Sequence, residues 1–238
     1  LRPGSEALKH AARAAFEAPG WQAMPAAERE RLLLRLAELV ERHADELAAI
    51  ETLDNGMPFP AARAMGAGSA ISAIRYNAGW PRRLTGESVP VSVPGQWHGY
   101  TTHEPLGVAA LIVPWNAPLA ITANKLSAAL AAGCTVVLKP AELAPMTGLR
   151  LAELVLEAGF PAGTVNVVTG LGAAAGAALV AHPGVDKISF TGSTATGQSI
   201  LRESANDLKR VSLELGGKSA TIVYPDADLA RAVPGVAM

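Results

Sequence analysis

The first third of the chain places apolar residues at helical spacing among charged ones. Between Ala26 and Thr52 the apolar positions are Leu33, Leu36, Ala37, Val40, Leu47 and Ile50. A helix with 3.6 residues per turn brings such positions to one face. The pattern therefore predicts an amphipathic helix over 26–52, and a similar pattern predicts a second helix from Phe59 to Arg83.

The pattern changes between Gly86 and Glu104. Valines alternate with other residues at 89, 91 and 93, a Pro-Gly pair follows at 94–95, and Tyr-Thr-Thr occupies 100–102. Alternation on either side of a turn dipeptide is typical of a β-hairpin. We expect a hairpin arm over 87–104.

After Pro105, short Val/Ile/Leu runs alternate with Ala-rich helical stretches. The runs read GVAALIVP, CTVVLKP, TVNVV, DKISF and KRVSLEL, with SATIVY as the last expected strand. The helices expected between them cover 119–132, 146–157, 173–181 and 196–205. Continuous apolar strands separated by helices predict a parallel sheet covered on both faces. The fold class is therefore α/β, a Rossmann-like doubly wound sheet preceded by N-terminal helices and the hairpin.

Composition and charge narrow the class of protein. Half of the 238 residues are hydrophobic and 17% are charged, which is typical of a globular fold. Lys+Arg 20 against Asp+Glu 21 gives a net charge of −1 with no basic stripe, so no nucleic-acid partner is expected. The long uncharged runs 105–124 and 158–185 contain several prolines and glycines, so no membrane span is expected.

Cysteine and histidine usage bears on compartment and metal binding. The single cysteine, Cys134, cannot form an internal disulfide, which fits a reducing compartment, and a cytoplasmic location is expected. The five histidines share no ligand spacing, so no metal site is expected. The opening residues contain no targeting peptide, and both ends look truncated, with a helical pattern starting shortly before the last residue.

Polar and glycine residues follow several predicted strands, where doubly wound sheets bind their ligands. Thr191, Gly192 and Ser193 precede a helix, so they suit either a pyrophosphate or an ordinary helix N-cap. Lys139 and Glu142 could hydrogen-bond the hydroxyls of a ribose or form a solvated loop pair.

Three further residues have two interpretations each. Asn116 could donate to an oxyanion or cap the helix that begins near Pro118. Glu214 could be a partly buried general base with a raised pKa or an exposed acid at the end of a strand. Cys134 is the obvious nucleophile, but it precedes a strand at the opposite end from the other groups, which favours a buried structural thiol.

The ordered motifs PWN, LKPAE, FTGS and LELGGKS, each at a predicted strand end, resemble the NAD(P)-dependent aldehyde dehydrogenase superfamily. The resemblance covers nearly the whole chain. It implies an oxidoreductase that converts an aldehyde into a carboxylic acid. It also implies that 1–86 is the helical part of the cofactor-binding domain, 87–104 an arm that pairs subunits, and 105–238 the dinucleotide-binding domain.

The resemblance implies roles for individual residues. Asn116 would be the oxyanion-hole amide, Glu214 the base that activates water, and Lys125 a proton-relay group. The implied cofactor-binding residues are Trp115, Lys139, Glu142, Gly172, Gly176, Thr191, Gly192, Ser193 and Leu215. A carboxylate at Glu142 would repel a 2′-phosphate, so NAD is the expected cofactor, with NADP as the alternative.

One departure from the family pattern changes what this chain could do alone. The family's catalytic cysteine lies beyond the glutamate, in a second domain, whereas this sequence ends at Met238, and Cys134 does not match that position. The chain alone is therefore expected to be inactive, and the whole protein to be a homodimer or homotetramer. The alternatives are a catalytically silent dinucleotide-binding or subunit-pairing module and a CoA-acylating relative.

Overall fold

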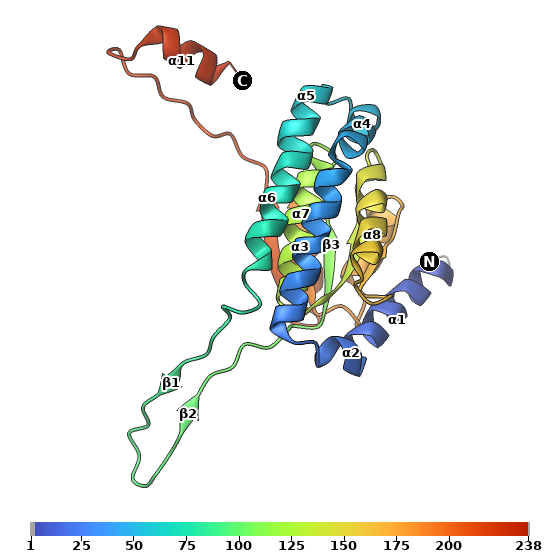
Figure 1. Ribbon diagram of the computed structural model, residues 1–238, viewed down its shortest axis with the longest axis vertical. Coiled ribbons are helices and arrows are strands. Elements are labelled where there is room, and N and C mark those ends of the chain that lie inside the picture. Colours follow the sequence, from blue (N-terminus) through green and yellow to red (C-terminus); the bar gives the residue numbers. More distant parts are fainter. Residues whose placement is uncertain (1–2, 238) are drawn as a thin grey trace.

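A computed structural model describes residues 3–237 of the chain, with side chains from His10 onward. Its centre is a parallel sheet, of which strand β3 is labelled in Figure 1. The sheet has five strands in the order β5-β4-β3-β6-β7. The strands are β3 (Val108–Ile112), β4 (Thr135–Lys139), β5 (Val165–Val167), β6 (Lys187–Gly192) and β7 (Arg210–Leu215). The chain moves outward from β3 in one direction, returns, and continues from β6 in the other. The doubly wound α/β fold predicted from the sequence is confirmed.

Both faces of the sheet are covered, and its central strand β3 is apolar at every position. All residues of β3 and β4 are buried. Along β3, Ala109 and Leu111 join the hydrophobic cluster on one face, whereas Val108 and Ala110 join the cluster on the other. This is the alternation of side chains expected of a strand buried on both sides.

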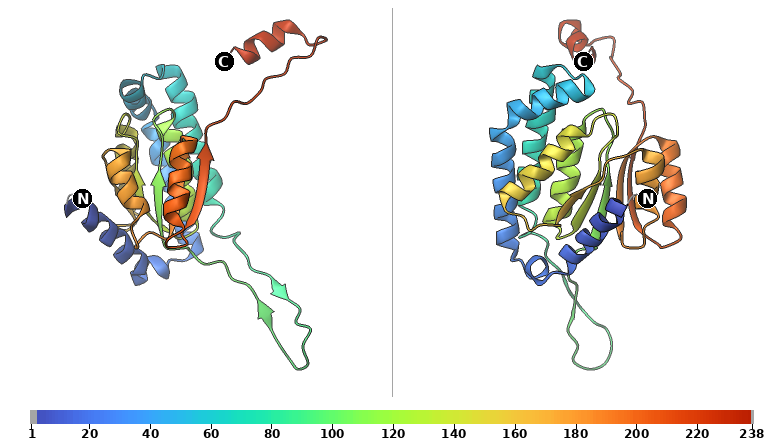
Figure 2. Two further views of the ribbon diagram at one scale, coloured as in Figure 1. Left: turned by 180° about the vertical axis from the view of Figure 1, so that it is seen from behind. Right: turned by 90° about the vertical axis from the view of Figure 1, so that its right-hand side faces the viewer.

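Helices form a layer on each face (Figure 2). The larger layer contains α3 (Ala26–Arg42), α4 (Ala44–Asn55), α6 (Ser69–Ala78), α7 (Pro118–Ala131) and α8 (Met146–Ala158). The opposite layer contains α1 (Pro3–Glu17), α9 (Ala177–Val180) and α10 (Thr194–Ser204). The remaining helical segments are α2 (Pro19–Gln22), α5 (Phe59–Ala61), α11 (Leu229–Val236) and the π-helical η1 (Ala62–Gly68) and η2 (Gly172–Gly176).

Helix α1, which the sequence analysis did not predict, is tied to the sheet by one carboxylate. Arg13 Nη2 donates to Asp186 Oδ2 at 2.6 Å and to the Gly184 carbonyl oxygen at 3.0 Å. The same Asp186 oxygen accepts the backbone N–H of Val108 at 2.7 Å. Gly107 is needed beside it, because its φ is +125° and an added Cβ would lie 2.0 Å from Asp186 Oδ2.

The single helix predicted over 26–52 was wrong, because the chain bends at His43 into α3 and α4. The two halves bury their apolar faces against different neighbours. Helix α3 packs on α6, whereas α4 packs on η1.

The second predicted helix, over 59–83, also differs from the structure. It begins as α5, widens into η1 and ends with α6 at Ala78. Gly79 follows directly and Pro81 lies two residues further on. A proline cannot continue the backbone ladder and disfavours helical geometry in the residue before it, so the helix stops there.

The hairpin prediction is confirmed. Strands β1 (Ser88–Val89) and β2 (Gly99–Tyr100) pair antiparallel in an arm that projects from the body (Figure 1).

Among the residues that the structure describes, no helix is both long and apolar enough to cross a bilayer.

The strand predicted for SATIVY was wrong. After β7 the chain leaves the sheet, and Ile222 and Tyr224 are exposed. Within the described residues this segment meets no strand with which its backbone could pair. The predicted terminal helix is present as α11, which stands apart from the body (Figure 1).

Candidate functional site

A cavity of about 850 Å³ lies at the carboxyl ends of β3, β4 and β6, where the strand order reverses. We call it the carboxyl-edge cavity. Helical segments η2, α9 and α10 form its other wall. Eight of the nine expected cofactor residues line it: Trp115, Lys139, Glu142, Gly172, Gly176, Thr191, Gly192 and Ser193. The ninth, Leu215, instead lies against Gly197 of α10, where an added Cβ would be 2.5 Å from a Leu215 methyl group.

Lys139 and Glu142 form an asymmetric pair at this cavity. Lys139 Nζ donates to Glu142 Oε2 at 2.8 Å, and the lysine side chain is only 3% exposed, against 40% for the glutamate. Glu142 Oε1 accepts the backbone N–H of Gly172 at 3.4 Å. The Lys139 hydrogen bond, followed by backbone N–H donors, lowers the pKa of Glu142 to about 2. The solvated-loop interpretation was wrong for Lys139, because its ammonium group is buried.

The end of β6 carries the N-cap residue of α10 and a glycine that packs against an aromatic ring. Ser193 caps α10, since its hydroxyl accepts the Thr196 N–H at 3.2 Å, so the capping interpretation holds for Ser193. A Cβ on Gly192 would lie 2.5 Å from the Phe190 ring, so glycine at this position lets the ring pack against the backbone. The buried hydroxyl of Thr191 has no hydrogen-bond partner within the described part of the chain. Thr191 also lines a second cavity.

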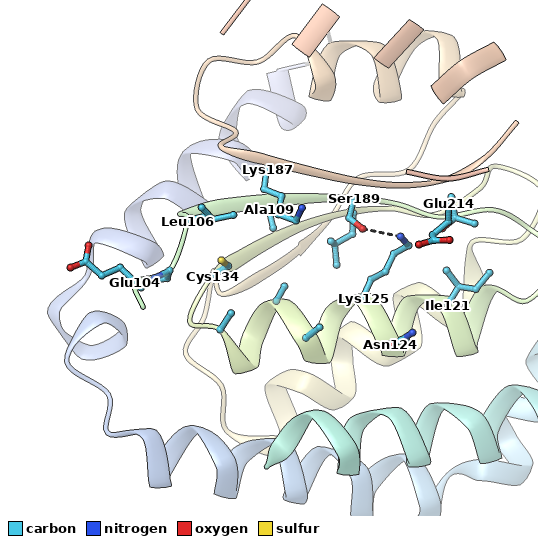
Figure 3. Close-up of a pocket in the computed structure, with 16 residues that line it drawn as sticks. Glu104, Leu106, Ala109, Ile121, Asn124, Lys125, Cys134, Lys187, Ser189 and Glu214 are labelled. Carbon is cyan, nitrogen blue, oxygen red and sulfur yellow. Dashed lines mark hydrogen bonds between the residues drawn. The ribbon is translucent and has the colours of Figure 1, made fainter. Parts of the chain in front are cut away.

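The second cavity, of about 660 Å³, lies between α7 and the sheet strands β3, β6 and β7. We call it the α7 cavity. Lys125 Nζ donates to Ser189 Oγ at 2.8 Å, and the carboxylate of Glu214 lies beside this pair (Figure 3). Burial lowers the pKa of Lys125, Glu214 raises it in part, and Lys187 lowers it further. The structure thus brings the predicted Lys125 and Glu214 together.

Of the two interpretations of Glu214, the exposed acid at the end of a strand is the one that the structure supports. It lies on β7, the edge strand of the sheet, and its side chain is exposed. No other segment of the described residues covers this edge, so water reaches the carboxylate.

Cys134 lies at the opposite end of the α7 cavity from Glu214 (Figure 3). It is 4% exposed and belongs to the hydrophobic cluster under α7. The expectation of a buried thiol at the far end of the strand is confirmed.

Asn116 follows β3 and is exposed at the entrance to α7. The N-cap residue of α7 is Ala117, and no side chain of the cap residue closes this helix end, so the capping interpretation of Asn116 was wrong. Two residues of α4 hold the neighbouring backbone: Asn55 Nδ2 donates to the Trp115 carbonyl oxygen at 3.1 Å, and Glu51 Oε1 accepts the Leu119 N–H at 3.5 Å.

Glu51 and Asn55 were not identified from the sequence. They are polar residues within an amphipathic helical pattern, where a charged side chain usually marks the solvated face. A signal was nonetheless present, because the periodicity places residue 51 one position after the apolar Ile50 and four after the apolar Leu47. Only the packing of α4 against α7 shows that this glutamate is buried.

Comparison with known proteins now identifies the family. The model of the aldehyde dehydrogenase family matches residues 4–238. The chain belongs to the aldehyde dehydrogenase family. Its parallel sheet and helical layers are those of the family's solved members.

Individual aldehyde dehydrogenases resemble the chain closely. An aldehyde dehydrogenase of Enchytraeus buchholzi is 51% identical over 94% of this chain and 45% of its own length. A phenylacetaldehyde dehydrogenase of Pseudomonas fluorescens is 49% identical over 97% of this chain and 47% of its own length. An NAD⁺ complex of an aldehyde dehydrogenase from Bacillus cereus superposes with a TM-score of 0.94 at 49% identity, covering 97% of this chain and 47% of that one. The chain thus spans about half the length of these aldehyde dehydrogenases.

Proposed function

We propose that this chain forms the NAD-binding part of an enzyme that oxidises an aldehyde to a carboxylic acid, and that it also supplies Asn116 and Glu214 to the reaction. The observation that carries the proposal is the carboxyl-edge cavity. It is lined by the buried Lys139, the half-exposed carboxylate of Glu142 and the backbone of Gly192. These residues lie where the strand order reverses, which is where doubly wound folds bind dinucleotides.

The residues present fit a dinucleotide. The paired Lys139 and Glu142 offer a donor and an acceptor to the two hydroxyls of a ribose. Gly192 and Ser193 line the cavity where α10 begins, and the free backbone N–H groups of a helix N-terminus favour a pyrophosphate. Because Glu142 stays ionised at neutral pH, its charge disfavours a 2′-phosphate, which supports NAD over NADP.

Bound NAD supplies the acceptor for the hydride that leaves the aldehyde carbon. Asn116, whose amide is not used to cap α7, is available to donate to the oxygen that becomes negatively charged when the carbonyl is attacked. Glu214 lies where water reaches it and takes a proton from the water that releases the acid. Lys125, beside Glu214 and with a lowered pKa, is placed to pass that proton onward.

The attacking thiolate comes from outside this chain. Cys134 is the single cysteine of the sequence, and it lies at the far end of the α7 cavity within the hydrophobic cluster. In the proposed reaction a cysteine sulfur would bond to the aldehyde carbon while Asn116 holds the oxygen, and after the oxidation water activated by Glu214 would replace sulfur at the acyl carbon. One aldehyde, one NAD⁺ and one water thus give one acid, one NADH and one proton.

The partners follow from the same proposal. An aldehyde is the small-molecule substrate, and the projecting hairpin arm supports a homodimer or homotetramer. The unpaired Cys134 supports a reducing, cytoplasmic setting.

Glu214→Gln tests the proposal in an active polypeptide of full family length that carries this chain. The amide cannot take a proton from water, so the first hydride transfer continues but the acyl-enzyme accumulates. We expect a burst of NADH of about one equivalent per site, followed by a steady-state rate at least ~100-fold lower. Stopped-flow absorbance of NADH measures both phases.

Glu104→Gln is the matched control, because Glu104 lines the same α7 cavity at the end away from Glu214 (Figure 3). It should show wild-type steady-state turnover. An unchanged steady-state rate in Glu214→Gln would contradict the assigned base.

The two alternatives give different results in the same assay. A CoA-acylating relative would need CoA for steady turnover of the unmodified protein. A silent binding or pairing module would bind NAD without aldehyde-dependent reduction. The proposed function expects rapid aldehyde-dependent turnover without CoA.

A further inference from the structure

One turn of α4 supplies two side chains to the segment that carries Asn116. Glu51 and Asn55 are four residues apart, so they lie on the same face of the helix. Asn55 Nδ2 donates to the Trp115 carbonyl oxygen at 3.1 Å, and the Leu119 N–H donates to Glu51 Oε1 at 3.5 Å. Asn116 lies between these two attachment points. Helix α4 therefore holds the backbone on both sides of it.

The start of α7 depends on this help because it has no cap of its own. Pro118 occupies the first turn and has no N–H, and the N-cap residue Ala117 has no side-chain acceptor. The first backbone donor, on Leu119, goes to Glu51. When a side chain of another helix accepts this N–H, the helix does not need the Asn116 side chain as a capping acceptor. The side chain of Asn116 is thereby kept free of the capping role.

Glu51 is an unusual residue to use for this purpose. It is fully buried, and its second oxygen, Oε2, has no hydrogen-bond partner among the described residues. Its carboxyl fits only because residue 66 is glycine: a Cβ there would lie 2.0 Å from Oε2. Burial raises the pKa of Glu51. A buried carboxyl with one hydrogen bond reduces stability relative to a well-packed apolar residue, so fold stability alone does not account for it.

We propose that Glu51 and Asn55 are positioning residues that hold Asn116 in the geometry required to stabilise the oxyanion. This inference rests on the proposed function, because it assigns the Asn116 amide to the substrate oxygen. Neither Glu51 nor Asn55 touches the substrate. They act through the backbone, and the effect is large because a displacement of about 1 Å at a reacting group can slow a reaction about 100-fold.

Asn55→Asp is the most selective variant, tested in an active polypeptide of full family length that carries this chain. It keeps the side-chain oxygen that accepts the Met57 N–H at 2.9 Å but removes the donor to Trp115. We expect the single-turnover rate of hydride transfer to fall about 10-fold with an unchanged Kd for NAD. Combined with Asn116→Ala, it should slow the reaction no further than Asn116→Ala alone, because its effect passes through Asn116.

Asp54→Ala is the matched structural control. Asp54 lies next to Asn55 and accepts the N–H of Met146 at the start of α8, at 2.8 Å. Its loss should lower the Tm while leaving hydride transfer at the wild-type rate. A rescue comparison tests Glu51: Glu51→Gln keeps an oxygen for the Leu119 N–H and should retain the rate, whereas Glu51→Ala should lower it about 10-fold.

The outcomes separate this inference from the proposed function. Three results would each overturn the positioning role and leave the proposed function intact. Asn55→Asp could transfer hydride at the wild-type rate, or its slowing could multiply with that of Asn116→Ala in the double variant. Asp54→Ala could also slow hydride transfer as much as Asn55→Asp does. A wild-type rate in Asn116→Ala itself would overturn the oxyanion role and the positioning role together.

Discussion

At the residue scale, two glutamates of the chain lie in opposite electrostatic environments. Glu142 is half exposed and bonded to a buried ammonium, so its pKa falls to about 2. Glu51 is fully buried with one backbone donor, so its pKa rises. The sign of each shift follows from whether a partner or desolvation is the larger influence. The first carboxyl is therefore available as a constant charge at neutral pH, and the second is biased toward its neutral form.

Glu142→Gln should remove a pH-dependent contribution to stability. The native pKa is lower than the usual value of 4.5, so the ionised group stabilises the fold fully above pH 4.5 and loses this effect as the pH falls toward 2. The stability difference between wild type and variant should thus be constant from pH 8 to 5 and shrink below 4.5. Because the carboxylate is half exposed, the constant difference should be about 1 kcal/mol or less. Urea unfolding at several pH values measures it, and a difference that grows in acid would contradict the assignment.

At the scale of elements, side chains join helices to distant segments by accepting hydrogen bonds from their backbone N–H groups. Asp186 joins α1 to the start of β3, and Glu51 joins α4 to the start of α7. Each bond spans a large sequence separation, so local propensity does not encode it. Such bonds fix the position of a helix, whereas the apolar periodicity of the sequence already predicts that the helix forms.

Asp186→Ala should loosen α1. The change leaves the Val108 N–H and the Arg13 guanidinium without their shared acceptor, so the free energy of unfolding should fall by about 2–3 kcal/mol. Hydrogen exchange of the α1 backbone should accelerate. Glu17→Ala is the control, because Glu17 lies 3.9 Å from the same arginine but is 63% exposed, and its loss should cost less than about 0.5 kcal/mol. Equal losses in the two variants would refute the anchoring role.

At the scale of the whole molecule, apolar side chains gather on the parts that leave the body. The hairpin arm exposes valines 89, 91 and 93 together with Trp97 and Tyr100, and the segment after β7 exposes Ile222 and Tyr224. Exposed apolar groups of this kind, collected on an arm, mark a contact surface. The body has a buried apolar cluster on each face of the sheet, and it also exposes single apolar side chains such as Leu53 and Leu208.

Trp97→Ser combined with Val91→Ser should weaken self-association. Burial of these two side chains at a subunit contact would contribute a few kcal/mol, so we expect the dissociation constant of the oligomer to rise at least ~10-fold. Sedimentation velocity over a concentration series measures this. Leu156→Ser, a 56% exposed position on α8, is the control and should leave association unchanged. An unaltered dissociation constant in the hairpin variant would exclude the arm from the interface.

The sequence by itself determined the class of fold. Continuous apolar runs such as GVAALIVP, separated by helical stretches, favour a parallel sheet covered on both faces, which is the doubly wound class. It also placed Lys139, Glu142 and Gly192 at one edge, because parallel strands end on the same side. The ordered motifs identified the family that the comparisons show.

Only the tertiary structure decided which polar groups are buried and what they contact. The sequence could not show that Lys139 is covered, that Glu214 is open to water, or that Asn116 leaves the capping of α7 to Glu51. It misjudged SATIVY for the same reason, because an apolar alternation becomes a strand only where a neighbour can pair with it. Burial and pairing depend on contacts between segments far apart in the chain, which no local pattern specifies.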